Sequence, residues 1–471
     1  MPACFFMKRF RGPRSGWPYS RFVIATAALL GGCAGARYKR PDVPVPPAYR
    51  GDTEEPATKG NATLGELRWQ DLVRDQQLSM LIKEALSKNF DVQIATARVL
   101  QARAQLTATR SAQFPLVAAQ TSYVNSRSLA LDTSETTLQV SAGWQLDLWG
   151  QLRNTSAAAR ASLLASDQAR RVVMQTLVGE VADSYFLLED LDLELESTRQ
   201  ALKLRQDSLA LVQLRVDNGY SSELDLHQAE VLVESANTAL TGLELQIEQT
   251  ENQLAILLGR NPGPVARARS LSEERLAPTL PAGLPSTLLN RRPDICEAEQ
   301  QLVASHALVA VAKAAYFPTI ALTSSSGFQS SALHNLVSDL SGIWLVGPTV
   351  SLPIFNAGAV RAGVRSAQAQ QQQAMLLYRK TVQQAFREVA DSLVENRRLA
   401  ELRVQQQALV ESLRQAVELS DLRYKGGVAS YLDYLDSERQ LLDAEVLLVQ
   451  IRRQQLTNAV SLYLALGGGW Q

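Results

Sequence analysis

The chain has 471 residues, with 47 basic and 47 acidic side chains. Five of the basic residues and none of the acidic ones lie in residues 1–32, so residues 33–471 carry 42 basic against 47 acidic side chains and a net charge of −5. This balance excludes the broad basic face of a nucleic-acid-binding protein, and the three cysteines, of which Cys4 and Cys33 lie near the start of the chain, exclude a disulfide framework.

Residues 1–32 have the pattern of a signal peptide. Basic residues precede an apolar run, Phe22–Leu30, which is shorter than the roughly 20 residues of a transmembrane helix. The run leads into Leu30-Gly31-Gly32-Cys33, which resembles the lipobox of bacterial lipoproteins. We therefore predict that Cys33 is the first mature residue and is lipidated; the alternative is a chance cysteine in a cleaved leader. Ala34 after the cysteine implies sorting to the outer membrane.

The segment 33–68 is predicted to be an extended arm. Four prolines between Pro41 and Pro47 favour a polyproline II conformation.

The rest of the chain consists of two copies of one internal repeat. The stretch LRVDNGYSSELDLHQAE (Leu214–Glu230) matches LRYKGGVASYLDYLDSE (Leu422–Glu438), and Phe114-Pro115 matches Phe317-Pro318. Each half reads as a helix, a Phe-Pro step, two extended segments, a very long helix, a glycine turn and a helix. The predicted parts are a first repeat at 69–259, a linker at 260–291, a second repeat at 292–468 and a tail at 469–471.

Alternating apolar and polar residues predict strands in each half. The clearest run is 138–148, and a less regular one covers 344–355. Their expected partners begin after the Phe-Pro steps, at 116–126 and 319–328. Each segment is about as long as the 10 residues that a tilted strand needs to cross a bilayer. The alternative is the edge of a soluble sandwich, but the sequence places no helix over the apolar face of these strands.

Four strands cannot close a barrel in a membrane. An open edge in lipid leaves backbone groups without hydrogen bonds, and membrane barrels begin at about eight strands. The chain must therefore share its barrel with copies of itself, and the strand count alone allows two copies or three.

Two helices are predicted to be unusually long. Between 151 and 218 there is one glycine and no proline, and the same holds between 359 and 424, so each span is on the order of 100 Å long. Apolar residues follow coiled-coil spacing, while glutamine, serine and alanine fill the other faces. This pattern predicts helices packed side by side into a wall that is wet on both surfaces. A dimeric rod is the alternative, although it explains neither the strands nor the repeat.

Five motifs resemble those of the TolC-type outer-membrane factors, in particular the lipidated NodT/OprM-like branch of tripartite efflux systems. They are YKRPDVPVP (38–46), ARVLQARAQL (97–106), LDLWGQLR (146–153), RRPDICEAEQQL (291–302) and SLPIFNAG (351–358). The resemblance implies a mainly α protein with a small β part. In a homotrimer, four strands per chain would form one 12-stranded barrel and the long helices a periplasmic α-barrel. It also implies a periplasmic adaptor protein and an inner-membrane pump as partners.

The resemblance also assigns positions to local motifs. The junctions between strands and helices would lie at Asp147, Trp149, Gly150, Pro353, Phe355 and Gly358. The periplasmic tips would turn at Asn218, Gly219, Gly426 and Gly427.

Acidic residues near the tips are candidates for a gate. They are Asp225, Asp421, Asp433 and Asp436. By resemblance, Asp433 and Asp436 fall where TolC-type proteins have constricting carboxylates, which a trimer would arrange in rings that favour cations. The alternative for Asp225 and Asp433 is helix capping, because each lies three residues after a serine.

We expect a passive exit duct of a tripartite efflux pump that carries small toxic compounds. The sequence shows no nucleophile elbow, phosphate-binding loop or metal-ligand spacing, so we expect no enzymatic activity, cofactor or metal site. One alternative is a duct for protein or polysaccharide export. Another, of a different class, is a structural trimeric stalk, which predicts a coiled coil without membrane strands.

Overall fold

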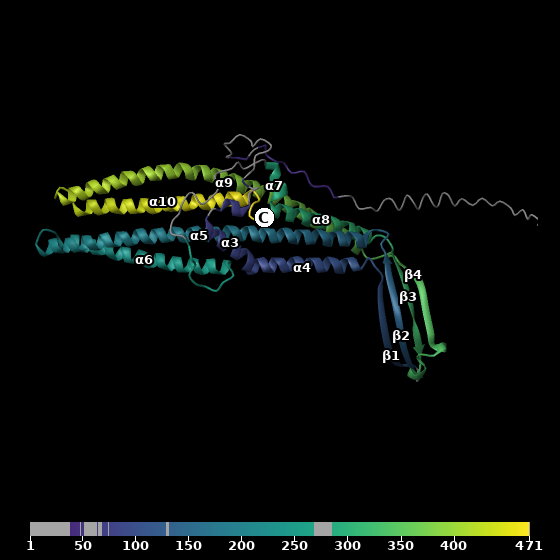
Figure 1. Cartoon of the computed structure of the whole chain (residues 1–471). Coiled ribbons are helices and arrows are strands. Elements are labelled where there is room, and N and C mark those ends of the chain that lie inside the picture. The colour runs from purple at the N-terminus through teal and green to yellow at the C-terminus, as the bar shows by residue number, and fades with distance from the viewer. Residues whose placement is uncertain are drawn as a thin grey trace, which may run out of the picture. The chain divides into compact units, whose positions relative to one another are not determined.

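The computed structural model describes residues 38–47, 49–50, 64, 68–73, 75–128, 131–267 and 285–470 (Figure 1). The helices are α2 (Trp69–Leu72), α3 (Gln76–Lys88), α4 (Phe90–Ser111), α5 (Gln151–Asp217), α6 (Glu223–Leu257), α7 (Pro285–Arg291), α8 (Pro293–Ala314), α9 (Ala359–Lys425) and α10 (Tyr431–Ala465). The strands are β1 (Leu116–Ser128), β2 (Leu131–Leu146), β3 (Thr319–Ser330) and β4 (Gly342–Ser351). Two 3-10 turns, Leu333–Asn335 and Asp339–Ser341, connect β3 to β4.

The predicted twofold repeat is confirmed, and it holds at the level of single residues. Helices α4 and α8 begin at Phe90 and Pro293, which sets a numbering offset of 203 between the repeats. Helices α5 and α9 begin at Gln151 and Ala359, which sets an offset of 208, and α6 and α10 keep that second offset at both ends. The change from 203 to 208 falls between these helices, so the strand hairpin of the second repeat is longer than that of the first.

The four strands form one antiparallel sheet in the order β1-β2-β3-β4, so β1 and β4 are its edges (Figure 1). The pairing of β2 with β3 joins the two repeats and places Leu146 opposite Ile320. This arrangement confirms a mainly helical chain with four strands.

Two predicted strand limits are wrong. Strand β2 begins at Leu131, well before Leu138, because its polar first part pairs with β1 as far as Ser128. Strand β4 ends at Ser351, because this residue pairs with Thr319, where β3 begins. Alternation locates the half-buried part of a strand, whereas its ends depend on the length of the neighbouring strand.

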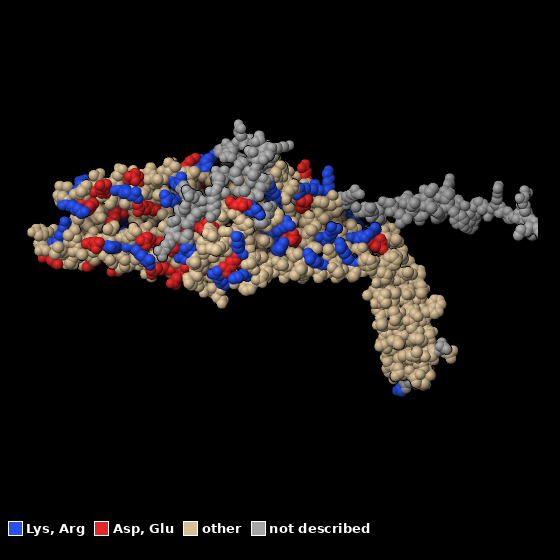
Figure 2. Space-filling view, in the orientation of Figure 1, with Lys and Arg blue, Asp and Glu red and all other residues tan. Residues whose placement is uncertain are grey.

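The sheet has one apolar and one polar face. Opposite residues in an antiparallel pair point to the same face, and alternate residues point to opposite faces, so the register fixes both sets. The apolar face carries Val117, Ala119, Tyr123, Leu138, Val140, Ala142, Trp144, Ile320, Leu322, Phe328, Trp344, Val346 and Val350. The other face carries mainly Gln, Ser and Thr. Figure 2 shows almost no charged side chain along the visible face of these strands.

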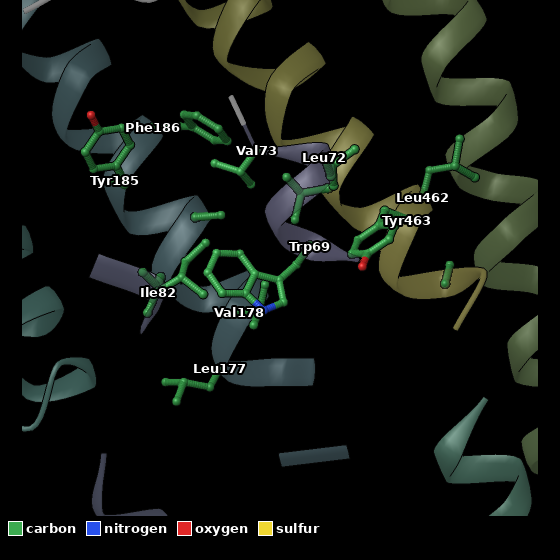
Figure 3. Packing of buried hydrophobic residues seen from close by; sticks show 14 of the residues in the cluster. Trp69, Leu72, Val73, Ile82, Leu177, Val178, Tyr185, Phe186, Leu462 and Tyr463 are labelled. Carbon is green, nitrogen blue, oxygen red and sulfur yellow. The ribbon is translucent and has the colours of Figure 1, made fainter. Parts of the chain in front are cut away.

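The chain divides into two compact units, and the sheet belongs to the one formed by residues 38–39, 108–157 and 306–368. The other unit contains most of the helical sequence and the main hydrophobic core. In that core Trp69 of α2, Val178 of α5 and Tyr463 of α10 lie close together (Figure 3). Asp75 caps α3 and also accepts a hydrogen bond from the buried Tyr185 hydroxyl at 3.0 Å. The short helices are thereby fastened to the middle of α5.

The two long helices have 67 residues each, which corresponds to about 100 Å. Helix α5 lies beside α6, and α9 lies beside α10 (Figure 1). Ion pairs cross each hairpin, from Arg199 to Glu244 at 3.0 Å and from Arg414 to Glu445 at 2.8 Å. Among the described residues, no helix combines the length and the apolar character that crossing a lipid bilayer requires.

Candidate functional site

The tips of the two long helical hairpins are built alike. Gly219 and Gly427 both have φ of 74°, a left-handed backbone that favours glycine. In each turn the following amide reaches back five residues, from Tyr220 to the Arg215 carbonyl at 2.8 Å and from Val428 to the Arg423 carbonyl at 3.0 Å. These bonds close a Schellman motif. The structure therefore places Asn218, Gly219, Gly426 and Gly427 in the two tip turns.

Two of the four acidic gate candidates cap helices. Asp225 accepts hydrogen bonds from the Ser222 amide at 3.0 Å and from the Ser221 and Ser222 hydroxyls at 2.9 Å. The backbone N–H of Ser222, together with these hydroxyls, lowers the pKa of Asp225. Asp433 forms the same capping box with Ser430 at the start of α10. Both carboxylates therefore stabilise the first turn of a helix.

The other two candidates do not cap a helix. Asp436 accepts hydrogen bonds from Arg439 at 2.9 Å and from Gln440 at 2.5 Å, both on the next turn of α10. The hydrogen bond from Arg439 is the main cause that lowers the pKa of Asp436, and the one from Gln440 adds to it. The exposed carboxylate therefore keeps a negative charge. Asp421 forms an ion pair with Lys425 at 2.7 Å on α9.

Asp436 lies on the wall of an apolar groove of about 510 Å³ between the first turns of α6 and α10. The groove is lined by Leu224, His227, Gln228, Val231, Leu232, Leu432, Leu435, Asp436 and Arg439. Three of the leucine and valine side chains, Leu224, Val231 and Leu432, are more than half exposed in the chain. One surface near the tips thus combines apolar side chains with a charged pair.

An aromatic cluster that was not predicted from the sequence lies beside the tips. The Tyr424 ring lies 5.2 Å from the Tyr431 ring and 6.3 Å from the Tyr434 ring, measured between centroids. Arg215 of α5 stacks on Tyr424 and donates to its hydroxyl at 2.6 Å. Burial is the main cause that raises the pKa of Tyr434 to about 12, and the neighbouring carboxylates of Glu438 and Asp421 add to the rise. The signal in the sequence was three tyrosines close together around a glycine turn.

The first junction between strand and helix is closely packed. The Asp147 carboxylate accepts hydrogen bonds from the amides of Leu152 and Arg153, at 3.1 and 2.8 Å, and so caps α5. The Trp149 ring stacks on Phe317 at 4.8 Å, and its Nε1 donates to the Pro318 carbonyl at 2.7 Å. The LDLWG motif therefore ties the end of β2 to the beginning of β3 across the repeat.

The second junction is open in the single chain. Gly150 and Gly358, which occupy equivalent places before α5 and α9, have φ of 76° and 84°. Ile354 and Phe355, however, are 95% and 89% exposed, and Pro353 beside them is exposed as well. Their counterparts in the first repeat, Gln145, Leu146 and Asp147, are only partly exposed, so the second junction is more open than the first.

The described part of the arm is fixed to the helices. Arg40 forms an ion pair with Glu299 of α8 at 2.5 Å and donates to the Asn290 side chain at 2.9 Å. Tyr49 is buried, and its ring lies 6.4 Å from that of Phe386 on α9. The predicted lipidation site, Cys33, lies outside the described residues.

A buried carboxylate on α5 gives the helical unit a pH dependence. Asp190 is 2% exposed, and Arg453 of α10 donates to its Oδ2 at 2.6 Å. Burial raises the pKa of Asp190 to about 6, although Arg453 opposes the rise; Glu194 adds to it. The carboxylate therefore holds a proton more tightly in the folded chain than in the unfolded chain.

We expect the free energy of unfolding to increase by about 1 kcal/mol per chain as the pH falls from 7 to 5, because the folded state gains the proton on Asp190 in this range. Asp190→Asn should remove most of this dependence, and Asp207→Asn, an exposed change on the same helix, should keep it. Chemical unfolding at several pH values measures both slopes. An unchanged slope in Asp190→Asn contradicts the assignment.

The comparisons with known proteins identify the family. The family model Outer membrane efflux protein matches residues 81–260 and 284–468. The chain is 36% identical to the probable efflux pump outer membrane protein TtgC of Pseudomonas putida, over 95% of each chain. It is 35% identical to the cation efflux system protein CusC of Escherichia coli K12, over 96% of this chain and 100% of CusC.

Solved structures give the same result. A crystal structure of CusC superimposes with a TM-score of 0.84 at 35% identity and covers 93% of this chain and 100% of that one. The open-state structure of the Neisseria gonorrhoeae MtrE outer membrane channel also has a TM-score of 0.84, at 31% identity, and covers 93% and 99% of the two chains. The resemblance inferred from the sequence motifs is confirmed, and the chain belongs to the outer membrane efflux protein family.

Proposed function

We propose that the chain forms the outer-membrane exit duct of a tripartite efflux pump. The observation that carries this proposal is the four-stranded sheet with one apolar and one polar face, in the same chain as helices of about 100 Å. The apolar face suits lipid and the polar face suits a water-filled lumen. The helices provide the length to reach partners in the periplasm.

The duct contains three copies of the chain. Both edges of the sheet carry unpaired backbone groups, which lipid would leave without hydrogen bonds at several kcal/mol each, so the barrel must close through other copies. Three chains give twelve strands, in keeping with the outer-membrane factors that the motifs resemble. Cys33, once lipidated, would assist the placement of this trimer in the outer membrane. A relative of this chain, SilC of Salmonella typhimurium, is described as a probable outer membrane lipoprotein.

The tips provide the face for a periplasmic adaptor and, through it, for an inner-membrane pump. Equivalent positions in the two repeats expose apolar side chains: Leu214 and Leu422, Tyr220 and Val428, and Leu224 and Leu432. The groove between α6 and α10 begins beside them. An adaptor that presents apolar side chains on a helical hairpin would bury this surface.

Transport through the duct is passive and requires no catalytic step. Relatives are named for cation, toluene and antibiotic efflux, so one duct architecture serves chemically different cargoes. The pump therefore selects the cargo, and we assign small toxic compounds as the class that this duct conducts. Deleting the gene in its host should increase accumulation of such compounds, and the intact gene should restore export. If the gene restores export although its protein product does not reach the outer membrane, the proposal is contradicted.

We assign the charge filter of the duct to Asp436. Asp225 and Asp433 are used as caps, whereas Asp421 and Asp436 each pair with one basic residue of their own helix. Of these two, Asp436 has the more exposed side chain, 50% against 31%, and it lines the groove beside the tips. Three copies would form a ring of negative charge that favours cations.

Asp436→Ala is expected to lower the cation-to-anion permeability ratio about fivefold, because a ring of carboxylates in a narrow pore attracts cations and repels anions. The reversal potential of single channels in a salt gradient measures this ratio. Asp225→Ala is the matched control: it should lower stability by about 1 kcal/mol through loss of the cap and leave the ratio unchanged. An unchanged ratio in Asp436→Ala removes this residue from the filter.

A further inference from the structure

The unit that contains the sheet carries its charges at its two ends. No Lys, Arg, Asp or Glu occurs in this unit at 111–126, 136–146, 314–338 or 340–360. In the halves of the strand hairpins that are remote from the helices, the acidic residues are Asp132, Glu135 and Asp339. Figure 2 shows, on its visible face, a sheet almost free of charge and basic side chains where the sheet meets the helices. The uncharged band therefore ends at a basic boundary on the helix side.

This basic boundary is repeated in both halves of the chain. Arg110 lies in the last turn of α4 and Lys313 in the last turn of α8, each six residues before the next strand begins. Their numbers differ by 203, the offset between these two helices. Arg153 and Arg361 are the third residues of α5 and α9, and their numbers differ by 208, the offset between those helices. Each helix that joins the sheet thus carries a basic residue in the turn nearest to the strands.

Most of these cations have no acidic partner within the chain. Arg110, Lys313 and Arg361 are exposed, and so is Arg365, one turn further along α9. Among the described residues, no carboxylate forms an ion pair with any of the four. Arg153 is different, because it pairs with the Asp147 carboxylate that caps α5. The chain therefore leaves four positive charges unbalanced at this level.

Helix stability accounts for only half of the pattern. A cation in the last turn of a helix interacts favourably with the macrodipole, which suits Arg110 and Lys313. Arg361 lies in the first turn of α9, where the same dipole disfavours a cation, and neither α5 nor α9 has an acidic residue in its first turn. What the repeated positions share is their level beside the sheet, and not their place within a helix.

Exposed aromatic side chains lie between the basic residues and the strands. Phe114 follows Arg110 and is 68% exposed, and Tyr316 follows Lys313 and is 51% exposed. Aromatic rings favour the boundary between the hydrocarbon core of a bilayer and its headgroups. From the strands to the helices, an apolar face, aromatic rings and cations follow one another. This order matches the hydrocarbon, the boundary and the phosphates of one membrane leaflet.

We propose that Arg110, Lys313, Arg361 and Arg365 bind the phosphate groups of anionic phospholipids in the leaflet that faces the periplasm. This inference rests on the proposed duct, in which the sheet crosses the bilayer and the helices extend into the periplasm. Long basic side chains reach the headgroups from the protein surface. A zwitterionic lipid neutralises its own phosphate, so these cations favour lipids with a net negative charge.

The association of lipids with the purified oligomer in phosphatidylcholine vesicles tests this proposal. The vesicles receive a trace of spin-labelled phosphatidylglycerol or of spin-labelled phosphatidylcholine, and electron spin resonance measures the fraction of each label that the protein immobilises. We expect the native oligomer to bind phosphatidylglycerol about fivefold more strongly than phosphatidylcholine at low salt. The ratio should fall to near one in the fourfold variant Arg110→Gln, Lys313→Gln, Arg361→Gln and Arg365→Gln.

A matched fourfold variant removes the same number of charges from exposed positions of the other compact unit and should keep the ratio. Its changes are Lys83→Gln, Lys203→Gln, Arg379→Gln and Arg397→Gln. A second measurement needs no variant: for the native oligomer, about 0.5 M salt should also lower the ratio, because salt screens exposed charges. It tests the proposal even if the first variant fails to assemble.

A ratio near one for the native oligomer at low salt, or an unchanged ratio in the first variant, overturns the lipid assignment. A variant that keeps the ratio and shifts the reversal potential of single channels overturns it as well, because its cations then line the lumen. These results leave the duct intact, since channel currents in pure phosphatidylcholine report on the duct separately. Oligomers that carry no current there overturn the proposed function itself.

Discussion

Replacing Arg292 with alanine is expected to lower the free energy of unfolding by about 3 kcal/mol. The Arg292 side chain is only 9% exposed and forms ion pairs at 2.7 Å with Asp294, at the start of α8, and with Glu388 of α9. It also donates to the Ala465 carbonyl at the end of α10. Alanine leaves the two carboxylates close together without their shared cation, and the carbonyl loses its donor.

Chemical unfolding followed by helical circular dichroism measures this loss. Arg387→Ala is the matched control, since its side chain is 63% exposed and lies 4.0 Å from Asp391, and its cost should stay below about 1 kcal/mol. Arg292→Lys keeps the charge but loses the forked contact with Asp294, so an intermediate result is expected. Equal effects of Arg292→Ala and Arg387→Ala would contradict the role given to the RRPD motif.

Replacing Trp149 with alanine is expected to destabilise the unit that contains the sheet by about 3 kcal/mol. The change removes a ring that stacks on Phe317 and leaves the Pro318 carbonyl without its donor. Because this contact joins β2 to the beginning of β3, its loss should lower the yield of folded oligomer in the outer membrane.

Trp149→Phe separates the two contributions. It keeps a stacking ring and loses only the Nε1 hydrogen bond, so its cost should be about 1 kcal/mol. The temperature at which the oligomer dissociates on denaturing gels orders the three proteins. A Trp149→Phe protein as unstable as Trp149→Ala would show that the hydrogen bond, and not the stacking, fixes the junction.

The long helices could be predicted almost to the residue. The predicted span 151–218 corresponds to α5, Gln151–Asp217, and the predicted span 359–424 corresponds to α9, Ala359–Lys425. Helices of this kind are bounded by local signals, here a glycine with positive φ before and after each one. Strand limits were less accurate, because they depend on a partner strand that is distant in the sequence.

The residues at the tips also show that local features can be predicted from the sequence, whereas features that depend on distant residues cannot. A capping box is a local pattern, so the structural alternative for Asp225 and Asp433 could be stated from the sequence and is present in the structure. The tyrosine cluster with Arg215 was missed, because it brings α5 against the turn of α9 and α10 from a distant part of the sequence. A gate role requires several copies of one carboxylate, and no pattern within one chain can supply that.

Electrical recording of the purified oligomer in planar lipid bilayers tests most directly whether copies of this chain form a water-filled duct. We expect discrete current steps of uniform size that favour cations and lose most of this preference in Asp436→Ala. Oligomers that insert into the bilayer and carry no current, in the native chain and in Asp436→Ala alike, would show that the chain forms no duct.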